Sequence, residues 1–322
     1  MIIGITKEQI AAENRVAITP QIAEQLIKSG FSIIMEQNAG KNAGFDNDSY
    51  SAKSVAIKAT AGEIFSSSDI ILKIWAPTVD EQKYLKNSQL IIADFSRCQY
   101  SDFHFNTIAL NKIPRLSRAQ NIDILSSQDN LSGYKAALLA CNQINRCVPM
   151  MITAAGTIPP LKVFIWGLGV AGLQAAATVK RLGAKVFATD IREETSLQAQ
   201  SVGAEFIPSD SLKSNLMKFD IIICCAGRYP TAPILIDKNT YQKISTSAVV
   251  LDISGNIAQE IKSPNLLREY NLASTIANSA SQLFAQNLYN LLQLIYNPNT
   301  QNLSINLQDE LIQSIYKGAS AK

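Results

Sequence analysis

Three glycines and one aspartate between positions 162 and 192 have the residue types and spacing of a nucleotide site. Gly167, Gly169 and Gly172 form the pattern G-x-G-x-x-G. Such glycines let the chain turn tightly, let a pyrophosphate approach the backbone and let a helix pack closely on a strand. Asp190 follows 18 residues after the last glycine, where an acid can accept a hydrogen bond from a ribose 2′-hydroxyl. The pattern predicts a dinucleotide site, and the carboxylate favours NAD over NADP because it would repel a 2′-phosphate.

The elements that must position these residues are a strand, a helix and a second strand. Apolar runs predict strands at Lys162–Trp166 and Lys185–Ala188. Helical spacing predicts a helix from Val170 to Leu182, which ends at Gly183. The phosphates would then face the N–H groups and the positive dipole end of this helix. The alternative is a Rossmann-type fold that has lost its nucleotide.

Composition limits the class of protein. The chain has 322 residues, a hydrophobic content of 47% and a net charge of +3. The length predicts two domains, and the small, scattered charge argues against nucleic acid as a partner. Five cysteines without a C-x-x-C pair fit a reducing cytoplasm, and a single histidine, His104, argues against a protein-held transition metal. No signal peptide is evident, and no apolar run is long enough to span a bilayer.

Strands and helices alternate along the rest of the chain. A helix is expected to start at Thr19-Pro20 and others to cover Asn130–Arg146 and Ser281–Ile295. Further strands are expected at Ile2–Ile5, Phe31–Met35, Ile70–Ile74, Leu90–Ala93, Thr107–Leu110, Phe206-Ile207, Phe219–Cys225, Ala248–Ile253 and Leu272–Ile276. This alternation predicts an α/β fold of two Rossmann-like, doubly wound parallel-sheet domains with a cleft between them. The expected domains are residues 1–127 with 279–322, and residues 128–278.

Polar residues before the second domain could recognise a carboxamide. Arg115 offers paired donors, Gln120 offers an amide and Asp123 offers an acceptor. A solvated loop remains the alternative.

Two basic residues lie near expected strand ends. Arg15 is expected to be a surface residue with its stem packed along the domain, whereas Lys73, inside an apolar run, could equally face a cleft.

Several segments resemble the alanine dehydrogenase and pyridine nucleotide transhydrogenase superfamily. They are the opening G-I-T-K-E and E-N-R-V-A-I-T-P, the segment L-K-I-W-A-P at 72–77 and the glycine motif. The segment P-R-L-S-R-A-Q-N-I-D-I-L-S-S-Q at 114–128 resembles the NAD(H)-binding domain I of proton-translocating NAD(P)⁺ transhydrogenase in particular. The resemblance implies that four residues hold the nicotinamide where hydride leaves it: Arg115, Gln120, Asp123 and Ser126.

The resemblance also implies a cofactor and partners. NAD(H) would bind this chain, and NADP(H) would bind a partner subunit. The expected NAD(H) contacts are Gly167, Gly169, Val170, Ala171, Gly172, Asp190, Ile191, Arg192, Ala226 and Gly227. The chain would be a cytoplasmic homodimer with its contact at 153–160, held at the inner membrane by NADP(H)-binding and membrane-spanning subunits.

The sequence departs from the family pattern in places. Only eleven residues, Pro208–Lys218, separate two expected strands where the family has a long mobile loop with a covering Tyr. Tyr229 could substitute for that Tyr or be an exposed loop residue. The family's Gly-Gly is replaced by Ser254-Gly255-Asn256.

Two other functions remain open. Alanine dehydrogenase would need a catalytic His after the Leu90–Ala93 strand and an Asp at position 256; the sequence has no His there and carries Asn256. In that enzyme Arg15 and Lys73 would bind substrate. The shortened loops also leave open a nucleotide-binding subunit that has lost catalysis.

Overall fold

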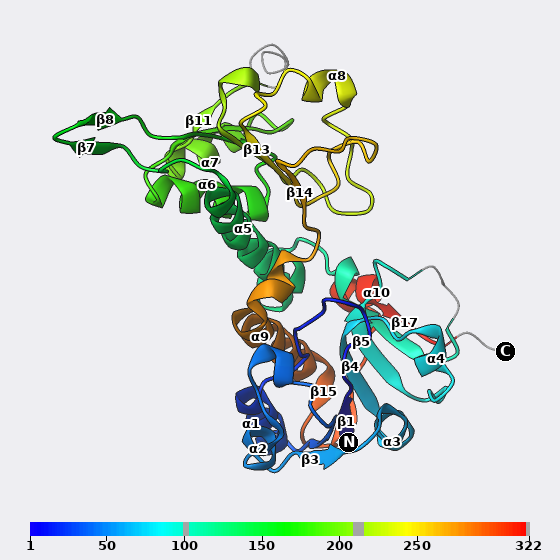
Figure 1. The fold of residues 1–322 in the computed structure, drawn as a ribbon. Coiled ribbons are helices and arrows are strands. Elements are labelled where there is room, and N and C mark those ends of the chain that lie inside the picture. The colour runs from blue at the N-terminus through cyan, green and yellow to red at the C-terminus, as the bar shows by residue number, and fades with distance from the viewer. Residues whose placement is uncertain (99–102, 209–215, 320–322) are drawn as a thin grey trace. The chain divides into compact units, whose positions relative to one another are not determined.

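The computed structural model describes residues 1–98, 103–208 and 216–319. They form two compact units, one of residues 1–128 with 274–322 and one of residues 129–273 (Figure 1). Each unit is built on its own mainly parallel sheet, so the predicted α/β class is confirmed.

The first unit contains a seven-stranded sheet in the order β17-β6-β5-β4-β1-β2-β3. All neighbouring strands are parallel except β17, which pairs antiparallel with β6. Their bounds are β1 Ile2–Ile5, β2 Ser32–Glu36, β3 Ala56–Lys58, β4 Ile70–Trp75, β5 Leu90–Asp94, β6 Asn106–Ala109 and β17 Tyr316–Lys317. Strand order reverses between β1 and β4, which is where parallel α/β sheets usually bind ligands.

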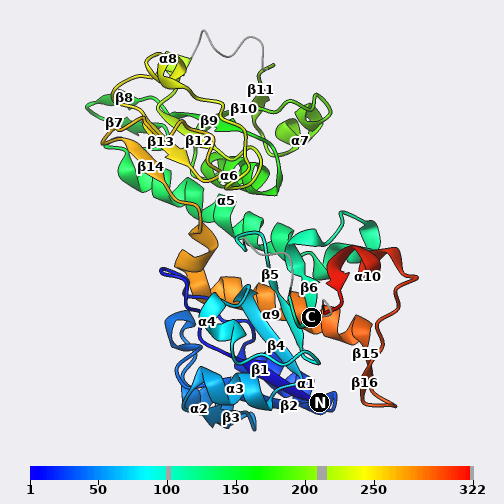
Figure 2. The same cartoon turned by 90° about the vertical axis from the view of Figure 1, so that its right-hand side faces the viewer.

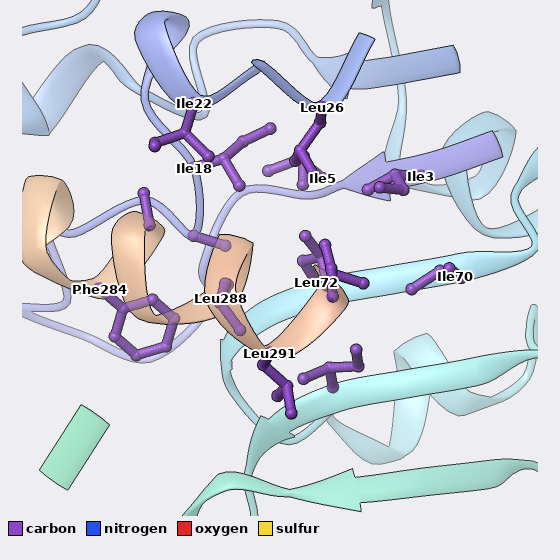
Figure 3. Close-up of a cluster of buried hydrophobic side chains, with 14 of the residues drawn as sticks. Ile3, Ile5, Ile18, Ile22, Leu26, Ile70, Leu72, Phe284, Leu288 and Leu291 are labelled. Carbon is purple, nitrogen blue, oxygen red and sulfur yellow. The ribbon is translucent and has the colours of Figure 1, made fainter. Parts of the chain in front are cut away.

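Helices cover both faces of this sheet (Figure 2). The helices are α1 Pro20–Lys28, α2 Asn47–Ser51, α3 Ala61–Ser67, α4 Val79–Gln82, α9 Ala277–Ile295 and α10 Glu310–Ile315, with 3₁₀ turns η1 Lys41–Ala43, η2 Leu110–Lys112 and η3 Ser117–Ile122. One face packs on α1, α9 and α10, and the other on α3. Figure 3 shows Phe284, Leu288 and Leu291 of α9 in the same buried cluster as Leu72 of β4. A small hairpin, β15 Tyr296–Asn297 with β16 Asn302–Leu303, follows α9.

The second unit contains six parallel strands in the order β11-β10-β9-β12-β13-β14. Their bounds are β9 Lys162–Trp166, β10 Lys185–Thr189, β11 Glu205–Phe206, β12 Ile221–Cys224, β13 Val249–Asp252 and β14 Leu266–Arg268. Its other elements are α6 Val170–Arg181, α7 Thr195–Ser201, η5 Leu216–Lys218 and α8 Lys238–Tyr241, besides the hairpin of β7 Met151–Thr153 and β8 Gly156–Ile158. Helix α5, Ile124–Gln143, contains the boundary between the units at 128/129.

Most expected elements are confirmed, but the strand predicted at Leu272–Ile276 is wrong. That segment is a 3₁₀ turn, η6, and β14 at Leu266–Arg268 pairs with β13 instead. The prediction failed because Leu272 and Ala273 are buried, whereas the three residues of β14 are only half-buried and include Arg268. Within the described ranges, no helix combines the length and apolar character needed to cross a membrane.

Candidate functional site

The glycine turn has the local geometry that its sequence predicts. It leads from the end of β9 into α6, and Gly167 has a φ of +101°, a conformation that L side chains rarely adopt. A Cβ on Gly172 would lie 1.8 Å from the carbonyl oxygen of Gly167, so helix and strand pack closely there. A Cβ on Gly169, by contrast, would have no neighbour within 4 Å in the described structure. The open side of the turn is therefore at Gly169.

Asp190 is connected to this turn directly. Its Oδ2 accepts from the N–H of Leu168 at 2.7 Å, and its Oδ1 accepts from Nε of Arg192 at 2.9 Å. Burial acts to raise the pKa of Asp190, but these donors outweigh it and lower the pKa below its usual value. The carboxylate at the end of β10 is thus ionised at neutral pH and held beside the first residues of α6.

The other expected NAD(H) contacts of this unit are accessible. Ile191 is 88% exposed, and Val170 is exposed at the start of α6. Arg192 and Gly227 are exposed, and Ala226 lies half-buried in the turn after β12. Ile191 is thus an exposed apolar side chain next to the ionised Asp190, and such a side chain could contact the flat face of a nucleotide base.

Asn256 holds the turn after β12 in place. Its Oδ1 accepts from the N–H of Ala226 at 3.0 Å, and its Nδ2 donates to the carbonyls of Ala226 and Pro233 at 2.8 and 2.9 Å. It is fully buried. Asn256, the position where alanine dehydrogenase would need an Asp, is therefore fully engaged in holding backbone groups.

Tyr229 is an exposed loop residue, which is one of the two alternatives expected for it. Its ring is 40% exposed and stacks on Tyr270, with centroids 4.2 Å apart and an angle of 9° between the rings. Arg228 beside it pairs with Asp129 at 2.6 Å. The loop shortening predicted at Pro208–Lys218 falls mostly on residues 209–215, which lie outside the described residues.

The four predicted nicotinamide residues belong to the first unit, in and around η3 and the start of α5. Arg115 and Gln120 are exposed. Asp123 caps α5: its Oδ1 accepts from the N–H of Ser126 at 2.9 Å, and its Oδ2 accepts from Ser126 Oγ at 2.6 Å. Because that hydroxyl gives its proton to Asp123, its remaining lone pairs can only accept.

Arg15 is buried, so its prediction as a surface residue is wrong. It is 6% exposed, pairs with Glu13 at 2.7 Å and donates to Gln128 Oε1 at 2.8 Å. Trp75 Nε1 donates to the same Glu13 carboxylate at 2.7 Å. The stem-on-surface expectation failed because Glu13 pairs with Arg15 inside the fold, where the distant Gln128 and Trp75 complete the hydrogen bonds of the pair.

Lys73 is also buried, at 1% exposure. Its Nζ lies 3.0 Å from Glu81 Oε1, 3.7 Å from Glu8 Oε2 and 3.0 Å from Thr6 Oγ1. Burial acts to lower the pKa of Lys73, but the two carboxylates outweigh it and raise the pKa. Lys73 is thus a charged centre of a buried ion-pair cluster at the end of β1.

Sequence analysis did not predict two groups of hydrogen bonds around η3. Asn287 and Asn290 of α9 both donate to the carbonyl of Asn121, and Arg118 forms a bidentate pair with Asp309, the N-cap of α10. One signal was present in the sequence. Asn287 is a polar residue on the apolar stripe of α9.

Two sequence matches together span nearly the whole chain. Residues 4–132 match the N-terminal domain of the alanine dehydrogenase/PNT family, and residues 136–320 match its C-terminal domain. The chain therefore belongs to the alanine dehydrogenase/PNT family, as its motifs predicted.

The transhydrogenase branch provides close relatives. The chain is 34% identical to an NAD(P) transhydrogenase alpha-subunit polypeptide of Rhodospirillum rubrum, over 97% of this chain and 94% of that protein. The solved structure of the transhydrogenase from Sinorhizobium meliloti matches with a TM-score of 0.90 and 32% identity, over 99% of both chains. An L-alanine dehydrogenase structure has a TM-score of 0.82 at 20% identity, over 98% of this chain and 94% of the other, which is a likeness of fold.

Proposed function

We propose that this chain is the NAD(H)-binding subunit of a proton-translocating transhydrogenase and that it transfers hydride between NADH and NADP⁺ bound to a partner subunit. The observation that carries the proposal is Asp190, an ionised acid fixed against a glycine turn, in a chain similar to transhydrogenase alpha subunits over almost its whole length. The pyrophosphate would lie at the open side of the turn, beside Gly169 and the start of α6. Asp190 would accept from the adenosine ribose, and Ile191 would contact the base.

The first unit would orient the nicotinamide. The nicotinamide supplies the hydride chemistry, and the protein supplies orientation. Ser126 Oγ, which donates to Asp123, would accept from the carboxamide NH₂. Arg115 and Gln120 would donate to its carbonyl oxygen. A direct hydride transfer needs no general acid or base, which agrees with a chain whose one histidine, His104, hydrogen-bonds to the carbonyl of Leu85.

We also propose that the chain forms a homodimer through the β7–β8 hairpin, and that partner subunits hold it at the membrane. All six strand residues of the hairpin are exposed, and Figure 1 shows it extending away from the sheet of its unit. Ile152, which is 74% exposed, would be buried by a second copy. Ile152→Asp should therefore shift sedimentation from dimer to monomer. The control is Leu197→Asp, a substitution of an equally exposed residue on α7, which should stay dimeric.

A reconstituted assay tests the proposed reaction. The chain is mixed with the NADP(H)-binding domain of a transhydrogenase, NADH and a spectrally distinct NADP⁺ analogue. Reduction of the analogue should require both proteins. NADH binding and complex formation without transfer would instead support a non-catalytic subunit, and alanine-dependent reduction of NAD⁺ by the chain alone would support alanine dehydrogenase.

A further inference from the structure

Two asparagines of α9 converge on one backbone carbonyl of η3. Nδ2 of Asn287 and Nδ2 of Asn290 each lie 2.8 Å from the carbonyl oxygen of Asn121. This carbonyl is near the end of η3, where helical turns leave acceptors without internal partners. The two amides cap it from a helix more than 160 residues further along the chain.

Asn287 is in an unfavourable place for an amide. It is 9% exposed and lies in α9 between Phe284 and Leu291, next to Leu288. These three apolar residues pack into the hydrophobic core (Figure 3). The Oδ1 of Asn287 is buried and has no hydrogen-bond partner among the described residues. A buried acceptor without a partner destabilises a fold, so packing alone would favour an apolar residue here. What the amide contributes is its bond to η3.

The segment that the amides hold carries predicted nicotinamide residues on both sides. Ala119 and Ile122 face the core, at 1% and 2% exposure, whereas Gln120 between them is exposed. Asp123 follows directly and caps α5. The carbonyl of Asn121 is therefore a backbone acceptor between Gln120 and Asp123, and fixing it restricts how both side chains are presented.

We propose that Asn287 and Asn290 are positioning residues for hydride transfer, which act by holding the backbone that presents Gln120 and Asp123. This inference rests on the proposed function. The two donors share one acceptor, so either one alone keeps the carbonyl bonded. The loss of both releases it.

The expected size of the effect follows from the sensitivity of transfer to geometry. A displacement of about 1 Å in a reacting group can slow a reaction by roughly 10²-fold. We expect the double variant to transfer hydride about 10- to 100-fold more slowly than the wild type. Dinucleotide affinity should change little, because the glycine turn and Asp190 belong to the other unit.

The experiment compares Asn287→Leu, Asn290→Leu and the double variant with Gln293→Leu. Gln293 is an amide of the same helix that donates to Ser29 Oγ instead of η3, and it serves as the matched control. Each variant is measured for NADH affinity, for single-turnover transfer to an NADP⁺ analogue on the partner domain, and for melting temperature. Asn287→Leu should melt within about 2 °C of the wild type or above it, because it removes the unpartnered Oδ1.

The pattern of results identifies which idea fails. A loss of rate in the double variant that exceeds the product of the single effects, at unchanged NADH affinity, supports the inference. If the wild type transfers hydride and the double variant does so at the same rate, the inference is overturned and the proposed function stays intact. A fall in melting temperature and NADH affinity in parallel with the rate shows a structural role and also overturns it. A wild type that binds NADH but transfers nothing contradicts the proposed function itself.

Discussion

Asp190 is held by donors of two kinds, backbone N–H groups and the guanidinium of Arg192, and both bear on nucleotide selectivity. The N–H of Leu168 fixes its Oδ2, and the Arg192 guanidinium bonds to both carboxylate oxygens. The carboxylate of Asp190 therefore accepts the hydrogen bonds that these donors would otherwise offer to a ligand. Selectivity for NADH would then come from repulsion of a 2′-phosphate by Asp190, with Arg192 as the cation that such a phosphate would otherwise meet.

Asp190→Asn should therefore reduce selectivity. We expect NADH affinity to fall about 10- to 100-fold, since a hydrogen bond to a charged acceptor is lost, and NADPH affinity to rise. Calorimetric titration with both nucleotides measures this. The control is Asp220→Asn: Asp220 also accepts from a backbone N–H, that of Lys162, and pairs with Arg146, but lies before β12. Equal losses for both nucleotides in Asp190→Asn would contradict this role.

The same carboxylate sets a pH expectation. Its pKa in the folded protein lies below the usual 3.8, so it stays ionised from pH 8 down to pH values near that number. Selectivity for NADH should accordingly be constant over this range and decline only as the pH falls through the lowered pKa. A selectivity that already declines near pH 6 would show that another group controls it.

The buried ion pairs of Lys73 lead to a prediction about stability. Lys73→Met would leave Glu8 and Glu81 buried without their cation, and we expect it to lower the free energy of unfolding by about 3–5 kcal/mol. Burial raises the pKa of Glu8 above its usual 4.5, and removal of Lys73 raises it further. The deficit should therefore shrink as the pH falls, because the folded protein takes up a proton at Glu8.

Urea unfolding of Lys73→Met at several pH values provides the measurement. Lys83→Met is the matched control, because Lys83 pairs with Asp80 on the surface, where solvent screens the pair and its loss should change stability little. Combining Lys73→Met with Glu8→Gln and Glu81→Gln should recover part of the loss. A deficit that is independent of pH and of these carboxylates would point to lost packing instead of charge.

Sequence reasoning placed Asp190 correctly at the end of a strand that follows the glycine turn, but it did not predict the burial of Arg15, and the reason is physical. Asp190 depends on residues at most a few tens of positions away, in one strand–turn–helix–strand segment. Arg15 donates a hydrogen bond to Gln128, 113 residues further on, and Lys73 donates to Thr6, 67 residues before it. Local patterns contain no information on such pairings.

At the scale of elements, two glycines in the turn from β9 into α6 have different roles: one allows close packing, and the other leaves open space. Gly172→Ala would place a methyl 1.8 Å from a backbone oxygen and 3.0 Å from Cys225 Sγ, so α6 would have to move away from β9. We expect a loss of about 1–3 kcal/mol or more in the free energy of unfolding. Gly169→Ala meets nothing within 4 Å in the described structure and has an ordinary φ of −75°, so stability should be unchanged.

The same pair of variants should behave differently toward nucleotide. Gly169→Ala should bind NADH much more weakly despite its normal stability, because its methyl occupies the side of the turn that a pyrophosphate would approach. Thermal melting and NADH titration of the two variants give the comparison. Wild-type NADH affinity in Gly169→Ala would show that the pyrophosphate lies elsewhere.

Element prediction succeeded where periodicity is strong and failed at a sheet edge. The helix predicted at Ser281–Ile295 is observed as α9, extended by one turn to Ala277. The edge strand β14 has three half-buried residues and no clear alternation, whereas η6 beside it contains buried apolar residues. Burial without regular pairing therefore produced a false strand at Leu272–Ile276.

At the scale of the whole molecule, the glycine turn at 167–172 and the segment 115–126, which is proposed to orient the nicotinamide, belong to different units of one chain. The sequence has a single dinucleotide motif, at Gly167–Gly172, although the proposed reaction uses two nucleotides. Under the proposed function, the second nucleotide would bind outside these 322 residues. The two nicotinamides would have to meet without an intervening acid or base.

Direct transfer between two nicotinamides makes a prediction about isotopes. NADH with deuterium on one face of nicotinamide C4, incubated with this chain, a partner NADP(H)-binding domain and NADP⁺, should place the deuterium in NADPH and none in water. Only one of the two labelled faces should transfer, because the loop around Ser126 would present the ring in one orientation. Mass spectrometry of the product, with the opposite-face isotopomer as control, makes the measurement. Label in the solvent, or transfer from both faces, would mean that the hydride does not pass directly from a single fixed ring orientation.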